Sequence, residues 1–278
     1  MLAGVGAMQV RPLTRASPNR GFRRRIAEEM KMGDVPSLLA TYPRPRPPLP
    51  KGWQAIYTEV YKCSREGKTF LYRLAQRLES WMHHEVLCEA NTPRLLEIGA
   101  GTLNHVQYEP AVGRYDAIEP FQELYLSQLE ASRINRLCGD ISEIPLSERY
   151  ERIVSIAVLE HIADLPRVVA RAGLLLEKGG MFSAGIPSEG GFLWWLSWRT
   201  TVGLVARLKY GLDYGDLMRH EHLSSAPEII AVVSYFFRNC HITRFPMPFH
   251  NLSLYACILA SDPILDRCAI FANKEIEC

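Results

Sequence analysis

The chain has 278 residues, of which 47% are hydrophobic, and this is enough to bury the core of one large domain. Its 32 Lys and Arg residues nearly balance its 30 Asp and Glu residues, so the net charge of +2 does not indicate a nucleic acid partner. The seven cysteines form no Cys-x-x-Cys pair and no histidine cluster has zinc spacing, so we predict no metal site. An odd number of cysteines without a secretory signal favours the cytoplasm.

The first 50 residues differ in composition from the rest. Residues 1–27 carry six arginines and no acidic residue, which fits a solvated leader, an Arg-rich transit peptide or a basic tail for acidic lipid or RNA. Six prolines between 36 and 50 prevent a helix and predict an extended linker. We therefore predict a basic, proline-rich flexible leader at 1–50, dispensable for folding, and one domain at 51–278.

Short apolar segments alternate with helical patterns along the predicted domain. Apolar residues at helical spacing predict N-terminal helices between Trp53 and Cys88. The strands that follow are expected at 94–98, 114–119, 134–138, 151–156 and 181–186. Helices are expected between them at 103–109, 121–131 and 164–176. This alternation is typical of a doubly wound α/β fold with a mostly parallel sheet.

The last third of the predicted domain departs from this alternation. A helical insertion is expected at about 190–218, after the fifth strand, followed by a helix at 226–237 and strands at 240–245 and 252–259. The insertion contains Trp194, Trp195 and Trp198. These could rest on a membrane interface, line an apolar acceptor pocket or pack a helical cap onto the sheet. No apolar run reaches the ~18 residues of a transmembrane helix.

One segment, Leu95-Leu96-Glu97-Ile98-Gly99-Ala100-Gly101-Thr102, indicates a ligand site. A buried strand ends at Ile98, and the two glycines that follow allow a tight turn and a close approach of the backbone to a ligand. Glu97 stands just before that turn. A carboxylate at the end of an apolar strand is costly unless it meets a partner, such as the cationic or hydroxyl-bearing part of a ligand.

Two further acids complete this pattern. Glu119 ends the second predicted strand, 20 residues after Gly99, the offset at which α/β nucleotide-binding units place an acid on the ribose hydroxyls. Asp140 follows the third strand. Acids at three successive strand ends converge on one edge of a parallel sheet, which suits a ligand with an amino acid head, a ribose and an exocyclic amine. A dinucleotide site would place a third glycine at Asn104.

With these motifs the chain resembles the class I S-adenosylmethionine-dependent methyltransferases, from about Thr92 to Ala260. The segment from Tyr150 to Ile162 is similar to the fourth strand of that family and its hxVLEH continuation, and Leu174 to Phe182 is similar to its LKPGG turn. The resemblance implies a Rossmann-like sheet of seven strands and S-adenosylmethionine as the methyl donor. It also implies donor contacts from Glu97, Gly99, Ala100, Gly101, Glu119, Pro120, Asp140, Ile141, Ala157 and Val158.

Candidate catalytic residues lie in Arg219-His220-Glu221-His222, directly after the insertion. An imidazole could remove a proton from an acceptor, and Glu221 or another carboxylate could orient it. We favour His222 over His220 for this role, and a helix-capping role is the alternative for either. The His-x-His pair could also bind a metal, but no third ligand is evident.

Other polar residues have less specific roles. Glu160 and His161 follow the fourth strand and either set the turn there or lie near the acceptor. Glu189 follows the fifth strand and could meet a polar acceptor or face water. Three residues ahead of the sheet could belong to a lid over the donor or to the surface: Tyr57, Tyr61 and Lys62.

We predict a methyltransferase that acts on a small-molecule acceptor, with a hydroxyl oxygen as the methylated atom and an apolar or glycan-like acceptor. The alternatives are an RNA or protein methyltransferase and a catalytically inactive S-adenosylmethionine-binding protein. The chain lacks an Asn-Pro-Pro-Tyr-like motif and a basic stripe, which argues against RNA. Intact donor residues argue against an inactive protein. The acceptor's identity and the oligomeric state cannot be derived from one sequence.

Overall fold

The structure of the chain is a computed structural model that describes residues 35–54, 70–87, 92–109, 112–121 and 132–272. The predicted helix at 121–131 and the lid candidates Tyr57, Tyr61 and Lys62 therefore lie outside the described residues, as does most of the predicted leader (1–34).

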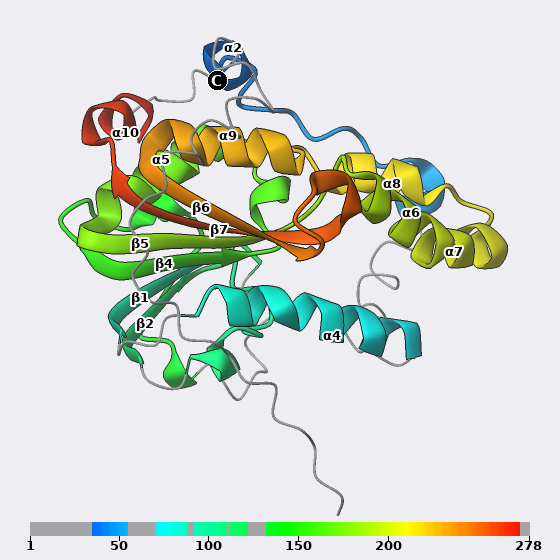
Figure 1. Cartoon of the computed structure of the whole chain (residues 1–278), viewed down its shortest axis with the longest axis horizontal. Coiled ribbons are helices and arrows are strands. Elements are labelled where there is room, and N and C mark those ends of the chain that lie inside the picture. Colours follow the sequence, from blue (N-terminus) through cyan, green and yellow to red (C-terminus); the bar gives the residue numbers. More distant parts are fainter. Residues whose placement is uncertain (1–34, 55–69, 88–91, 110–111, 122–131, 273–278) are drawn as a thin grey trace, which may run out of the picture.

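A seven-stranded sheet forms the centre of the molecule (Figure 1). Its strands are β1 (Thr92–Ile98), β2 (Val112–Ile118), β3 (Arg136–Cys138), β4 (Tyr150–Ile156), β5 (Leu176–Pro187), β6 (Phe237–Pro246) and β7 (Ser253–Pro263). They lie in the order β3-β2-β1-β4-β5-β7-β6, and only β7 runs antiparallel to its neighbours. This confirms the expected doubly wound, mostly parallel α/β fold.

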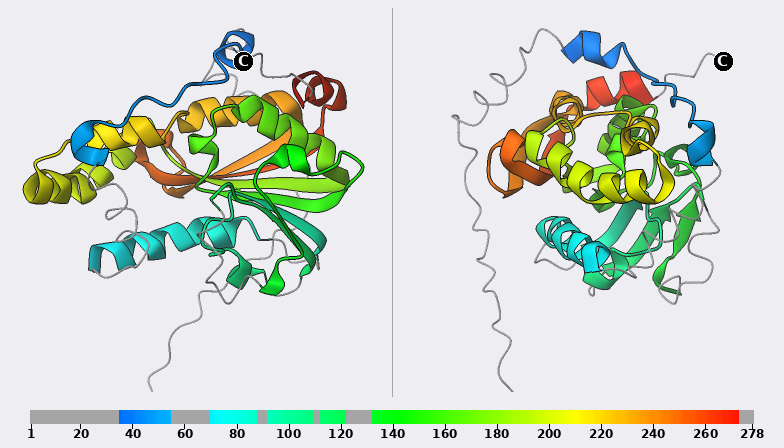
Figure 2. Two further views of the ribbon diagram at one scale, coloured as in Figure 1. Left: turned by 180° about the vertical axis from the view of Figure 1, so that it is seen from behind. Right: turned by 90° about the vertical axis from the view of Figure 1, so that its right-hand side faces the viewer.

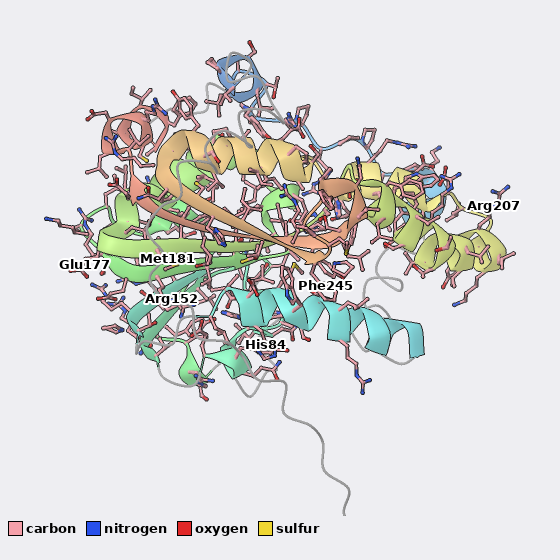
Figure 3. All side chains as sticks on the ribbon, viewed as in Figure 1. His84, Arg152, Glu177, Met181, Arg207 and Phe245 are labelled. Carbon is pink, nitrogen blue, oxygen red and sulfur yellow. The ribbon has the colours of Figure 1, made fainter. Side chains whose placement is uncertain are left out.

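Helices cover both faces of the sheet. On one face lie α5 (Leu165–Leu175) and α9 (Ala226–Phe236), and on the other lies α4 (Phe70–Glu85), as two further views also show (Figure 2). The expected insertion consists of α6 (Phe192–Thr200), α7 (Val202–Tyr210) and α8 (Tyr214–Glu221). It extends from one end of the sheet, so that Arg207 on α7 and Glu177 on β5 lie at opposite ends of the molecule (Figure 3). Two shorter helices are α2 (Val35–Leu39) and α10 (Leu265–Ala272).

The main hydrophobic core lies between the sheet and the helices α5 and α9. Ile153 and Phe182 of the sheet pack there with Val169 of α5 and Phe236 of α9, and all four side chains are fully buried. Both helices have strong N-terminal signals. The Asp164 side chain accepts a hydrogen bond from the Arg167 amide at the start of α5, and Ser225 and Glu228 form a capping box on α9.

The chain differs locally from the expected elements. The helix predicted at 103–109 is a turn followed by one short 3-10 helix, η2 (Val106–Tyr108). β5 begins at Leu176, five residues before the expected start at 181, because Leu176 already pairs with Tyr150 of β4. The helix α10, rich in apolar residues, was not predicted, and it packs against α5 through the buried Cys268 and Ala272.

The proline-rich segment at 35–50 lies against the domain. Leu39 and Tyr42 are buried in the main core, and the Tyr42 hydroxyl is 2.7 Å from that of Ser224. The Arg44 guanidinium forms an ion pair with Glu228 at 2.7 Å and donates to the Leu223 carbonyl at 2.6 Å. These residues therefore belong with the domain, whereas their proline content predicts a flexible leader. Proline prevents a helix here but does not prevent apolar side chains from docking.

We expect a chain that starts at Lys51 to be markedly less stable than the full chain. It lacks Leu39 and Tyr42, and burial of side chains of this size contributes roughly 1.5–3 kcal/mol each. The melting temperature should fall by roughly 10 °C. A chain that starts at Val35 keeps every contact described above and is the matched control in a thermal melt. Equal melting temperatures for the two truncated chains would contradict the prediction.

Candidate functional site

The glycine turn after β1 is hydrogen-bonded to the end of β2, which is in turn hydrogen-bonded to the end of β3. The amides of Gly99 and Ala100 both donate to the Ile118 carbonyl, at 2.8 and 3.1 Å, and the Glu119 amide donates to the Cys138 carbonyl at 2.8 Å. Gly99 has φ of +76°, and a Cβ placed on it would overlap the side chain of Val158. A larger residue therefore does not fit at this position.

The Glu119 side chain is hydrogen-bonded to this turn. One carboxylate oxygen accepts a hydrogen bond from the Gly101 amide at 2.7 Å, and the other accepts from the Phe121 amide at 2.9 Å. The Glu119 side chain is buried, and Pro120 beside it is exposed. The glycine turn and Glu119, 18 residues apart in the chain, therefore lie together at one edge of the sheet, as expected for the ends of neighbouring parallel strands.

Glu97 is buried next to Tyr115, whose hydroxyl donates to its carboxylate at 2.7 Å. Burial raises the pKa of Glu97 from 4.5 to about 8, although the hydrogen bond from Tyr115 acts in the opposite direction. At neutral pH this carboxyl group is therefore mostly protonated. A cationic group placed beside it would favour its ionised form.

The pKa of Glu97 predicts a pH-dependent stability. Because the folded state keeps a proton that the unfolded state loses above about pH 4.5, the free energy of unfolding should fall as the pH rises from there to about 8. The slope from this group is at most about 1.4 kcal/mol per pH unit. Glu97→Gln retains an acceptor for the Tyr115 hydroxyl but has no ionisable proton, so it should remove this part of the slope. Denaturant titrations of both proteins at several pH values test it. Parallel pH profiles would contradict the assignment.

The other predicted donor residues lie at neighbouring strand ends. Asp140 caps the 3-10 helix η5 (Ile141–Glu143), with its carboxylate accepting from the Ser142 amide at 2.8 Å, while Ile141 is buried. Ala157 follows β4 with φ of +53° and donates from its amide to the Gly185 carbonyl. The turn after β1 and the turn after β4 lie on either side of the point where the strand order reverses. In doubly wound sheets, ligands bind in the crevice at such a point.

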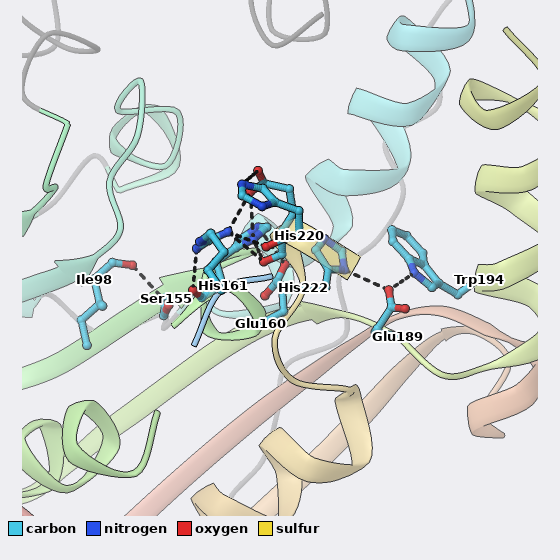
Figure 4. A network of polar contacts seen from close by, with 10 residues as sticks. Ile98, Ser155, Glu160, His161, Glu189, Trp194, His220 and His222 are labelled. Atoms are coloured by element: carbon cyan, nitrogen blue, oxygen red, sulfur yellow. Dashed lines mark hydrogen bonds and ion pairs between the residues drawn. The ribbon is translucent and has the colours of Figure 1, made fainter. Parts of the chain in front are cut away.

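A second polar cluster lies at the same edge of the sheet, after β4 and β5 (Figure 4). Glu160 and His161 stand in the short 3-10 helix η6 (Leu159–His161), and His222 is the first residue after α8. The amides of Leu223 and Ser224 both donate to the Glu160 carbonyl, at 2.7 and 3.2 Å. These two bonds hold the segment after α8 against η6 and thereby bring His222 next to His161.

Glu189, after β5, orients His222. Nδ1 of His222 lies 2.9 Å from a Glu189 carboxylate oxygen that also accepts from the Trp194 indole at 2.6 Å (Figure 4). Burial alone would raise the pKa of Glu189, but its interactions with His222 and the hydrogen bond from Trp194 outweigh burial and lower that pKa. The Trp194 ring also stacks on the His222 ring, with centroids 6.5 Å apart.

Glu160 is the most deeply buried acid of this cluster. It is 1% exposed, and burial raises its pKa to about 7. Within the described residues its Oε2 atom has no hydrogen-bond partner. Nε2 of His161 lies 3.8 Å from the other oxygen, and Nδ1 of His161 lies 2.7 Å from the Glu221 carbonyl.

The structure separates the two candidate histidines. Nδ1 of His220 lies 2.5 Å from the Pro47 carbonyl, so His220 faces the N-terminal segment, and His222 faces the cluster. The carboxylate that orients His222 is Glu189, whereas the sequence suggests Glu221 first because it is adjacent. Sequence reasoning also missed the partner of Glu97, Tyr115, although both lie on neighbouring parallel strands. It found no third metal ligand beside the His-x-His pair, whereas in the described part Glu160, His161 and His222 gather three possible ligands.

The tryptophans of the insertion have different surroundings. Trp194 belongs to the cluster, and Trp198 packs against Tyr214 with ring centroids 5.9 Å apart. Trp195 is 42% exposed. Of the described helices, none combines the length and hydropathy needed to span a bilayer.

Comparison with known proteins agrees with this architecture. Residues 96–184 match the family model of a methyltransferase domain. The chain is similar in fold to an S-adenosylmethionine-dependent methyltransferase of Thermotoga maritima, a possible histamine N-methyltransferase, with a TM-score of 0.53 and 17% identity over 76% of this chain and 99% of that one. No curated protein matches the chain in sequence.

Two further solved structures are less similar. The N-methyltransferase NodS of Bradyrhizobium japonicum, in complex with S-adenosylhomocysteine, has a TM-score of 0.49 and 15% identity over 76% of this chain and 97% of its own. An O-methyltransferase family protein of Burkholderia thailandensis has a TM-score of 0.47 and 12% identity, and covers 84% of this chain and 70% of its own.

The strand order and the two turns at its reversal point define the class I methyltransferase fold. Residues 96–184 match a methyltransferase domain, and the sheet that contains them has the fold of the class I S-adenosylmethionine-dependent methyltransferases.

Proposed function

We propose that this enzyme transfers the methyl group of S-adenosylmethionine to a hydroxyl of a small-molecule acceptor, and that His222 activates that hydroxyl. The observation that carries the proposal is the pairing of His222 with Glu189. Nδ1 of His222 is held at 2.9 Å from a carboxylate, which leaves Nε2 for an acceptor at the sheet edge. A sulfonium methyl is already activated, so the remaining work is alignment and, for a hydroxyl, proton removal.

The residues at the ends of β1 to β4 fit the methyl donor. The positive φ angles of Gly99 and Gly101 allow close backbone approach, and the buried Glu97 is available for a cationic amino group. We assign donor binding to these strand-end residues: Glu97, Gly99, Ala100, Gly101, Glu119, Pro120, Asp140, Ile141, Ala157 and Val158. When bound, the donor supplies an electrophilic methyl group.

Oxygen is favoured over nitrogen as the methylated atom by the residues around His222. A neutral amine is nucleophilic without assistance, whereas a hydroxyl gains from a neighbouring group that weakens its O–H bond. Glu160, His161, Glu189 and His222 supply two imidazoles and two carboxylates at one place, which a hydroxyl acceptor can use for proton removal and a neutral amine does not need.

The insertion supports a small acceptor. We assign the segment 190–218 to a cap over the acceptor, with Trp194 as the side chain nearest the catalytic cluster. An indole stacks on apolar rings and on sugars alike. The alternative of an RNA acceptor would depend on the basic residues at 1–27, which lie outside the described residues. The free thiols of Cys138, Cys240, Cys257 and Cys268 support the predicted cytoplasmic location.

A direct test uses matched acceptors. Purified enzyme is incubated with labelled S-adenosylmethionine and pairs of small apolar or glycosidic compounds that differ only in a hydroxyl or an amino group. We expect label in the hydroxyl compound of a pair. Methylation of the amine alone, at a rate that His222→Ala does not change, would refute the proposal. Binding of S-adenosylhomocysteine in calorimetry without turnover of any acceptor would favour the inactive binding protein.

Trp194 and Trp198 should differ in their effects on kinetics. Trp194→Phe keeps an aromatic ring but removes the hydrogen bond to Glu189, so we expect a higher acceptor KM with donor affinity unchanged. Trp198→Phe alters only packing against Tyr214 and should change the melting temperature rather than KM. Steady-state kinetics and thermal melts of both variants test this. A higher KM for Trp198→Phe alone would contradict the assignment.

A further inference from the structure

We propose that Glu160, His161 and His222 bind a divalent transition-metal cation such as Zn²⁺, Mn²⁺ or Co²⁺. One ligand atom from each residue lies within 4.8 Å of the other two, and the three side chains are grouped beside the end of β4 (Figure 4). The inference rests on the proposed function and specifies it: Nε2 of His222 binds the cation rather than the acceptor itself, and the cation activates the acceptor hydroxyl.

Both imidazoles are held as metal-ligating histidines usually are. Nδ1 of His161 lies 2.7 Å from the Glu221 carbonyl, and Nδ1 of His222 lies 2.9 Å from the Glu189 carboxylate. A carbonyl and a carboxylate only accept hydrogen bonds, so each Nδ1 carries the hydrogen and the neutral ring has its lone pair at Nε2. A histidine that binds a metal through one nitrogen typically donates from the other to such an oxygen, which fixes its tautomer and orientation.

Glu160 supplies a carboxylate that the rest of the described protein leaves incomplete. Its side chain is 1% exposed, and its Oε2 atom has no hydrogen-bond partner in the described residues. Nε2 of His161 lies 3.8 Å from the other oxygen, too long for a hydrogen bond. A buried carboxylate in this state is costly, and a cation between it and the two imidazoles removes that cost.

The ligands are fixed by the backbone before any cation arrives. Glu160 and His161 are neighbours in η6, and the Glu160 carbonyl accepts from the amides of Leu223 and Ser224, directly after His222. The Arg46 guanidinium also donates to the carbonyls of His161 and His220, at 3.0 and 2.9 Å. The three ligand side chains are therefore preorganised, and the partly exposed His161 side chain leaves a route for the ion.

Two imidazoles and one carboxylate suit zinc, manganese, iron and cobalt better than magnesium or calcium, which prefer oxygen ligands. Three protein ligands leave coordination positions open, and the acceptor hydroxyl would occupy one of them. The cation lowers the pKa of that hydroxyl, and its proton leaves to solvent water. The oxygen then forms its bond to the donor methyl while the sulfur keeps the electron pair of the broken C–S bond.

The test measures cation binding by the full-length protein after removal of any affinity tag and dialysis against EDTA. ZnCl₂ is titrated in a calorimeter, and CoCl₂ is added while the visible absorption of protein-bound Co²⁺ is recorded. We expect one tight site per chain and a higher melting temperature with either ion. Glu160→Gln should weaken binding by about 100-fold or more, beyond the 10–100-fold range of residues that orient ligands. Glu189→Ala should fall within that range.

His220→Asn is the matched control, since it alters the neighbouring histidine of the same segment, which faces Pro47. Glu160→Gln also guards against misfolding, because it replaces a buried ionisable group by a neutral one of the same shape, and without metal its melting temperature should equal or exceed that of the wild type. Equal zinc affinities for the wild type and Glu160→Gln would overturn the proposal, as would an equal loss in His220→Asn.

The two proposals fail in different ways. A wild-type protein that binds no Zn²⁺ or Co²⁺ but methylates a hydroxyl with the help of His222 refutes the cation site alone. A protein that binds the cation through Glu160 but methylates only amines refutes the hydroxyl acceptor alone.

Discussion

Replacement of His222 by alanine is expected to lower the rate of methyl transfer by about 10²–10⁴-fold, the range for a side chain that assists proton removal from a reacting group. The imidazole of His222 contacts Glu189 and Trp194, which both lie outside the strands. Alanine therefore removes the imidazole without disturbing the sheet. The binding of S-adenosylhomocysteine should not change, because His222 follows α8, whereas the proposed donor site begins at the glycine turn after β1. Single-turnover kinetics and calorimetry measure the two quantities separately.

His220→Ala is the comparison for this prediction. His220 is two residues away, but its ring faces the Pro47 carbonyl, so the variant should lose much less activity. Similar losses in both variants would show that the segment after α8 acts through its packing. A rate for His222→Ala close to that of the wild type would mean that alignment alone supplies the catalysis.

The second large effect is expected for Glu119→Ala, which should weaken donor binding by about 10–100-fold. A hydrogen bond to a charged group contributes roughly 1.5–3 kcal/mol, and the proposed contact is between this carboxylate and the ribose hydroxyls. The same carboxylate holds the amides of Gly101 and Phe121, so alanine also loosens the turn. Calorimetry with S-adenosylhomocysteine is the measurement.

Variants of two other acids are the controls for the loss of donor affinity in Glu119→Ala. Asp140 has a side chain that is 52% exposed, so Asp140→Asn should cost less affinity than Glu119→Ala. Glu177 lies at the far end of the sheet, and Glu177→Ala should bind the donor as the wild type does (Figure 3). If Glu119→Ala also binds like the wild type, the assignment of the donor site to these strand ends is wrong.

The sequence predicted the fold and the members of the glycine turn because their signals are local. Strand periodicity, two glycines and acids at strand ends lie within short windows, and the geometry of a parallel sheet brings those ends together. Glu119 and Gly101 are hydrogen-bonded for this reason.

The acceptor side was less predictable because its contacts span long stretches of chain. Glu189 and His222 are separated by three helices, and nothing local indicates that α8 brings them together. The same holds for Tyr42 and Ser224, whose contact crosses 182 residues. The prolines of segment 36–50 indicate that it cannot form a helix. They do not indicate that Tyr42 packs into the core of the domain.

The family match, residues 96–184, covers the proposed donor site but only part of the second polar cluster. The matched segment contains the proposed donor residues Glu97, Glu119 and Asp140. It ends before Glu189, Trp194 and His222 of the second polar cluster. It also begins after Arg44 and Arg46, which donate hydrogen bonds to the carbonyls of Leu223 and His220. The match therefore covers the proposed donor residues but not His222, the residue proposed to activate the acceptor. If the proposed acceptor site is correct, we expect proteins that share Arg46, Glu189 and His222 with this chain to methylate the same class of acceptor.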